Sequence, residues 1–169
     1  CRDQDILSRL VKPWTNFQQA SGRGSMALLD HVIGLASKAQ NHQLCAISIH
    51  SKGQISYLRS QNSVARQCAE QALNLYKQCG DLSGQADCIR SQGELVRMQS
   101  DHDQASQLFD QALNLYQQIG GLQGQANCIR SKGDLAHSQS DHAVASQFFK
   151  QALNINQQTG NLLGQAQCI

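Results

Sequence analysis

The chain has 169 residues, of which 40% are hydrophobic and 15% are charged, and its formal net charge is +2. This composition allows a packed core, but the small net charge argues against a nucleic-acid partner, whose phosphates require clustered Lys and Arg. No apolar run approaches the roughly 20 residues of a membrane-spanning helix, and no signal segment begins the chain. The seven cysteines lack C-x-x-C spacings, so we expect a reducing, cytoplasmic setting and no membrane.

Residues 1–30 are predicted to form a degraded helical unit at the start of the chain. Its apolar side chains, with Trp14 among them, are suited to cover the first helix pair, because the ends of a solenoid need a cap. The SGRGS segment at 21–25 suggests a phosphate-binding loop, yet no Lys-Ser/Thr follows it and no strand is predicted before it. We therefore expect a loop and then a helix that begins near Ser25.

From residue 31 onward, the sequence repeats with a period of about 40 residues, which is in the range that indicates a solenoid. The units are a faint copy at 31–70, two close copies at 71–110 and 111–150, and a partial copy at 151–169. Because the chain begins at Cys1 and stops at Ile169 inside a repeat, we expect a fragment of a longer polypeptide.

Each repeat predicts two helices joined by a polar turn. Apolar or small residues such as Ala86 and Gly93 follow one face of the first helix, and Ala105 and Phe109 follow one face of the second. Because glycine lacks a side chain, we expect Phe109 to fill the space beside Gly93. The next repeat has the same pattern. An antiparallel helix hairpin is therefore predicted for each repeat.

The predicted helices have recognisable ends. The Ser-Asp-His turns at 100–102 and 140–142 offer side chains that can accept the first free N–H groups of a helix. The second helix of each repeat is followed by a glycine, which adopts the left-handed conformation of a helix end at low cost. These glycines are Gly80, Gly120 and Gly160.

A polar stripe lies opposite the apolar face of each first helix. Stacked repeats would align these stripes into a ladder with charges of both signs, suited to a polar peptide of alternating charge. The candidate partner-binding residues are His50, Gln54, Tyr57, Asp87, Arg90, Glu94, Arg97, Asn127, Arg130, Asp134 and His137. The alternative is that Arg90 with Glu94, and Arg130 with Asp134, are surface pairs worth only about 0.2–0.5 kcal/mol each.

The cysteines and histidines do not form a catalytic or metal-binding pattern. Cys88, Cys128 and Cys168 recur once per repeat, too far apart for a disulfide or a shared zinc ion, so we expect small buried apolar residues. His102 and His142 follow Asp in the turns, but duplicated Asp-His pairs without a fixed nucleophile argue against a catalytic triad. We expect no enzyme activity, no metal and no cofactor.

The order Gly93, Ala105, Phe109 and Ala112 resembles the signature of the tetratricopeptide repeat, and it recurs in the next repeat. The period of about 40 residues is similar to the extended class of kinesin light chains, spindle-orienting adaptors and the sensor arms of signalling ATPases. One departure is a polar row, Lys52, Gln92 and Lys132, where the family usually has Leu. The resemblance implies an all-α, right-handed superhelical solenoid whose first helices line a concave groove.

From the stripe and the resemblance we expect a non-catalytic scaffold that binds a protein or peptide. The alternative is a regulatory arm of a larger signalling ATPase, protease or transcription regulator. An RNA-binding solenoid would need a shorter period and a basic groove. The apolar face at the last repeat also leaves end-to-end pairing with a second copy as a hypothesis.

Overall fold

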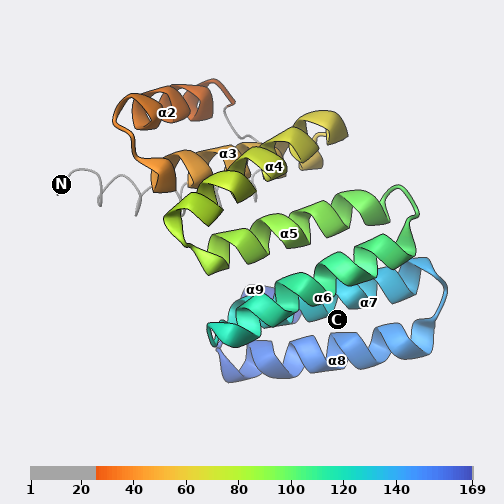
Figure 1. Ribbon diagram of the computed structural model, residues 1–169. Coiled ribbons are helices and arrows are strands. Elements are labelled where there is room, and N and C mark those ends of the chain that lie inside the picture. The colour runs from red at the N-terminus through yellow and green to blue at the C-terminus, as the bar shows by residue number, and fades with distance from the viewer. Residues whose placement is uncertain (1–25, 169) are drawn as a thin grey trace. The chain divides into compact units, whose positions relative to one another are not determined.

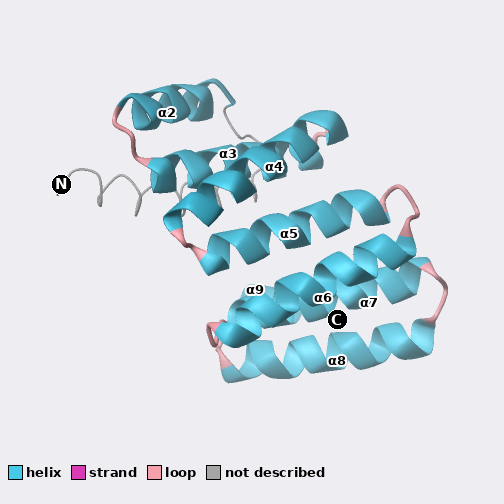
Figure 2. Ribbon diagram, in the orientation of Figure 1, coloured by secondary structure: helices cyan, strands magenta, loops and turns pink. Residues whose placement is uncertain are grey.

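The computed structural model describes residues 26–168, and the ordered elements of this part are all α-helices (Figures 1 and 2). They are α2 (Met26–Lys38), α3 (His42–Leu58), α4 (Asn62–Cys79), α5 (Leu82–Arg97), α6 (His102–Gln118), α7 (Leu122–Ser138), α8 (His142–Gln158) and α9 (Leu162–Ala166). Residues 1–25 of the unit predicted for residues 1–30, and the final Ile169, lie outside the described residues. Helix α2 is described from Met26 onward, and the predicted loop at 21–25 lies outside the described residues.

Helices that follow one another in the chain pack together, as the hairpin prediction requires. Contacts join α2 with α3 and α3 with α4, and likewise α6 with α7 and α7 with α8. The helices recur at the period of the sequence, since α5, α7 and α9 begin at Leu82, Leu122 and Leu162. The all-α fold of helix hairpins is therefore confirmed. No helix in residues 26–168 has the length and apolar character needed to cross a membrane.

The chain divides within α5, between Cys88 and Ile89, into two compact units. In the first unit, side chains of α2, α3 and α4 form a buried cluster with the start of α5. Its members include Ala36, Leu44, Ala72, Tyr76 and Cys88. Small residues predominate here, so the helix backbones can approach each other closely.

In the second unit, aromatic rings lie over glycines, as predicted. A Cβ atom built on Gly93 would lie 2.6 Å from Cε1 of Phe109, and one on Gly133 would lie 2.6 Å from Cε1 of Phe149. Phe109 is completely buried and packs with Val96, Ala105 and Leu135. Each glycine thus makes room for the ring of the following helix.

The helix ends confirm the predicted caps and add one feature that was not predicted. Asp101 accepts a hydrogen bond from the Gln104 N–H, and Asp141 accepts one from Val144, both over 3.1 Å. The glycines after the second helices have left-handed backbones, with φ between 66° and 69°. The serines after the first helices are also left-handed: Ser60, Ser100 and Ser140 have φ of 59°, 62° and 63°.

The polar row at Lys52 and Lys132 is explained by ion pairs between helices. Lys52 Nζ of α3 lies 2.5 Å from Asp30 Oδ1 of α2, and Lys132 Nζ of α7 lies 2.6 Å from Asp110 Oδ1 of α6. Lys132 Nζ is also 5.3 Å from the centroid of the Phe148 ring. Each lysine therefore joins a first helix to the second helix of the preceding repeat.

Candidate functional site

In the first unit, the predicted ladder residues lie on α3 and at the start of α5. His50 is only 7% exposed, and its ring meets the Tyr76 ring edge-on at a centroid distance of 6.5 Å. Its Nε2 lies 3.5 Å from Nε2 of Gln54. Gln54 and Tyr57 are half-buried. A buried His50 ring has little surface to offer a ligand, so Gln54 and Tyr57 are the more accessible part of this group.

Asp87 is half-buried and affects the electrostatics of its neighbours. Burial raises the pKa of the Cys88 thiol far above its usual value, and the negative charges of Asp87 and Asp81 raise it further. Burial likewise raises the pKa of Tyr76. Both groups stay neutral at physiological pH.

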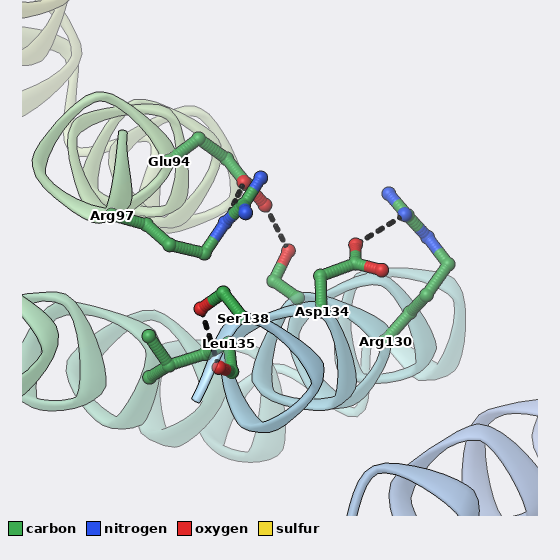
Figure 3. Close-up of polar contacts among 7 residues, drawn as sticks. Glu94, Arg97, Arg130, Asp134, Leu135 and Ser138 are labelled. Carbon is green, nitrogen blue, oxygen red and sulfur yellow. Dashed lines mark hydrogen bonds and ion pairs between the residues drawn. The ribbon is translucent and has the colours of Figure 1, made fainter. Parts of the chain in front are cut away.

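In the second unit, four predicted residues gather on neighbouring first helices (Figure 3). Arg97 Nε donates to Glu94 Oε2 over 3.1 Å on α5, and Arg130 Nη1 donates to Asp134 Oδ2 over 2.8 Å on α7. Ser131 Oγ of α7 donates to Glu94 Oε1 over 2.5 Å and joins the two helices. We call these five residues the α5–α7 polar cluster.

The α5–α7 polar cluster is partly withdrawn from water. The charged side chains are between 13% and 30% exposed, Glu94 least and Asp134 most. Burial raises the pKa of Asp134, and Glu94 adds to this, whereas Arg130, Arg97 and His137 act in the opposite direction. Arg130 Nε is buried without a hydrogen-bond partner in the structure. The cluster therefore combines compensated charges with an unsatisfied donor.

The remaining predicted residues lie at other points along the helices. Asn127 accepts a long hydrogen bond, 3.4 Å, from Gln123 on the same helix. Arg90 is half-buried, and its Nε lacks a hydrogen-bond partner although the side chain has other interactions. His137 is exposed at the end of α7, and its ring lies 5.3 Å from that of His142.

The pairing predicted as the alternative is confirmed for Arg130 and Asp134, which are paired at i,i+4. Glu94 accepts hydrogen bonds from Arg97 at i,i+3 and from Ser131. Ser131 was not predicted as a site residue. Serine recurs at 51, 91 and 131, and this recurrence was the signal that could have identified it.

Cysteine behaves as predicted at two positions of the repeated row. Cys88 and Cys128 are completely buried, and Cys168 is half-buried. Within residues 26–168, no group of three or more His, Cys, Asp or Glu residues could hold a metal ion.

Comparison with known proteins supports this architecture. The family model described as "Tetratricopeptide repeat" matches residues 85–158, which include the whole α5–α7 polar cluster. The crystal structure of BtubC (BKLC) from P. vanneervenii superimposes with a TM-score of 0.70 over 99% of this chain and 80% of that chain. Sequence identity is 14%, so this likeness concerns the fold. No curated protein matches the chain. The repeated hairpins, the glycine–phenylalanine contacts and the family match together show that the chain is similar to tetratricopeptide repeat proteins, with the sequence match confined to residues 85–158.

Proposed function

We propose that the protein is a non-catalytic scaffold that binds a segment of another protein, with the α5–α7 polar cluster of the second unit as a contact surface. Tetratricopeptide repeats generally mediate interactions between proteins, which supports the class of partner. The observation that carries the proposal is the gathering of Glu94, Arg97, Arg130 and Asp134 on neighbouring helices with Arg130 Nε left unsatisfied.

The cluster's charges indicate the chemistry of the partner segment. Arg97 and Arg130 are each already paired with a carboxylate of the chain, so a purely acidic segment that binds them would have to displace Glu94 or Asp134. A segment with side chains of both signs, or with backbone carbonyls that accept from arginine, can bind without breaking these pairs. We infer an extended, polar segment of mixed charge.

Affinity capture from the native cell extract tests the proposal. The bait is the full chain, as wild type and as the Arg90→Ala/Arg130→Ala variant. The control variant, Lys38→Ala/Lys77→Ala, loses the same charge at exposed positions of α2 and α4. We expect partners recovered by the wild type and the control to be depleted with the arginine variant. Circular dichroism confirms that all three chains are folded.

Binding of a purified partner then gives the magnitude. Loss of a charge-assisted contact costs about 1.5–3 kcal/mol, so the arginine variant should bind about tenfold more weakly or worse. Equal recovery and equal affinity for the three baits would show that this surface does not bind partners.

A further inference from the structure

The ion pair between Arg130 and Asp134 uses only part of the arginine. Asp134 accepts a hydrogen bond from Arg130 Nη1 at 2.8 Å, and the two residues are paired at i,i+4 on α7. Arg130 Nε is buried and makes no hydrogen bond in the part of the chain that the structure describes. A guanidinium can donate two parallel N–H groups to the oxygens of one oxyanion. Arg130 therefore keeps unused binding capacity.

The two carboxylates of the α5–α7 polar cluster are held differently. Glu94 accepts hydrogen bonds from Arg97 Nε at 3.1 Å and from Ser131 Oγ at 2.5 Å, and its side chain is 13% exposed. The Asp134 side chain is 30% exposed and pairs with Arg130 on its own helix. Figure 3 shows Asp134 turned toward Arg130, and Glu94 toward Arg97. Asp134 is therefore the carboxylate that a ligand can displace more readily.

Proton uptake by Asp134 makes this displacement easier. Burial raises the pKa of Asp134, and the charge of Glu94 on α5 raises it further. Arg130, Arg97 and His137 act in the opposite direction, but burial is the largest cause and the pKa is raised. A neutral carboxyl group attracts a guanidinium less than a carboxylate does. As pH falls through the folded pKa, Arg130 is therefore released to a competing anion.

We propose that Arg130 is an oxyanion-binding residue that opens when Asp134 takes up a proton, and that its ligand is an acidic side chain of the partner segment. The guanidinium turns from Asp134 and donates to the carboxylate of the segment, while the proton on Asp134 keeps the total charge of the site unchanged. Binding is thus coupled to proton uptake and strengthens as pH falls. The source of the carboxylate rests on the proposed function, whereas the anion site itself does not.

Two probes whose charge does not change with pH test the site. One is inorganic sulfate, and the other is a peptide in which cysteic acid alternates with glycine, so that sulfonates lie along an extended backbone. The proteins are the full chain as wild type, Asp134→Asn and Arg130→Lys, with Asp103→Asn as a control that changes an exposed carboxylate of α6. Isothermal titration calorimetry at about pH 5 and about pH 8 measures affinity and proton uptake. Circular dichroism at both pH values confirms folding.

We expect the wild type and Asp103→Asn to bind the peptide about fivefold more tightly at the lower pH, with uptake of protons. Asp134→Asn cannot ionise and should lose most of this difference, because it binds well at both pH values. Arg130→Lys keeps the charge but lacks the fork of N–H groups, so it should bind more weakly than the wild type. Absence of binding by both probes, pH-independent binding by the wild type, or unchanged affinity of Arg130→Lys would each overturn the proposal.

A further variant, His137→Gln, tests the neighbouring histidine, because histidines in general titrate at roughly pH 5 to 8. The pH dependence should persist in this variant, and its loss would overturn the role of Asp134. Tighter binding of the peptide than of sulfate would support a segment as the ligand, whereas sulfate binding at least as tight would identify a free anion instead and overturn that assignment.

The anion site and the scaffold function can fail separately. Equal recovery of partners by the three baits of the affinity capture would contradict the scaffold function, and pH-dependent binding of sulfate would still stand. Depletion of partners with Arg90→Ala/Arg130→Ala, together with sulfate and peptide binding that ignore pH, would support the scaffold and overturn the proton-linked site.

Discussion

Glu94 accepts one hydrogen bond from its own helix and one from α7, and the second is the shorter. Ser131 Oγ donates to Glu94 Oε1 over 2.5 Å, and Ser131 is completely buried. Hydrogen bonds to charged groups contribute about 1.5–3 kcal/mol. We expect Ser131→Ala to lower the free energy of unfolding by about this amount, measured by urea denaturation.

A matched control for this prediction is Ser146→Ala. Ser146 is exposed on α8, so this substitution should change the free energy of unfolding by less than about 0.5 kcal/mol. Similar effects of the two substitutions would mean that the bond to Glu94 contributes nothing to stability.

Asp134 makes stability depend on pH in a defined direction. Burial raises the pKa of Asp134 above the ordinary value of 3.8. At pH values between the unfolded and the folded pKa, the folded state therefore holds a proton that the unfolded state has released. Stability from this group is therefore present at low pH and lost as pH rises through the folded pKa. We expect the free energy of unfolding of Asp134→Asn, relative to wild type, to increase from acidic to neutral pH.

Urea denaturation of both proteins at a series of pH values measures this difference. A difference that instead decreases with pH would show that attraction to Arg130 outweighs the cost of burial.

At the scale of the helix pair, the contact between glycine and phenylalanine determines how closely the helices approach. A Cβ on Gly133 would lie 2.6 Å from Phe149, whereas a Cβ on Gly34 of α2 has nothing within 4 Å. We expect Gly133→Ala to destabilise the protein, and Gly133→Leu to cost about 1–3 kcal/mol through overpacking. Gly34→Ala should stabilise by about 0.5–1 kcal/mol, because alanine favours the helix.

The same contact seen from the ring gives a larger expected effect. Phe109→Ala removes a completely buried ring and should cost about 3–5 kcal/mol. Thermal and urea unfolding measure these variants side by side. Near-neutral results for both Gly133→Leu and Phe109→Ala would contradict the packing described for the second unit.

The turns after the first helices hold serine in a conformation that suits glycine better. Ser140 has a φ of 63°, and a left-handed backbone costs a residue with a side chain about 1–2 kcal/mol. Ser140→Gly should raise the free energy of unfolding by about 0.5–1 kcal/mol. Ser146→Gly, within α8, should lower it by a similar amount. Calorimetry distinguishes these opposite signs, and a destabilised Ser140→Gly would contradict the prediction.

At this scale the sequence predicted the parts that depend on local pattern. The period gave the hairpins, and the glycine and aspartate positions gave the caps at Gly80 and Asp101. The pairing of Lys132 with Asp110 was not predicted, because it joins residues 22 apart on different helices. The left-handed serines were missed because serine, unlike glycine, carries no strong preference for this conformation.

For the whole molecule, the sequence located the polar stripe and the pairing of Arg130 with Asp134 within one helix, but not the contacts between helices. Glu94, Arg97, Arg130 and Asp134 come from two helices, and periodicity places them on faces without showing which face meets which. The buried Ser131 that joins Glu94 to α7 depends on this meeting. The burial of His50 against Tyr76 depends likewise on the packing of α3 with α4. Such contacts depend on which helix faces meet, and periodicity within one helix does not determine this.

Position 150 carries Lys where the equivalent positions of the earlier repeats carry Asp30, Glu70 and Asp110, and this change limits how such an array can grow by duplication. A copy of residues 71–110 could be inserted after Asp110 and still offer an acidic residue to the lysine of the next repeat. A copy of residues 111–150 inserted after Lys150 would instead set lysine against lysine at the new junction. The repeats are therefore not interchangeable modules, because the residue at position 150 has the opposite charge to those at 70 and 110.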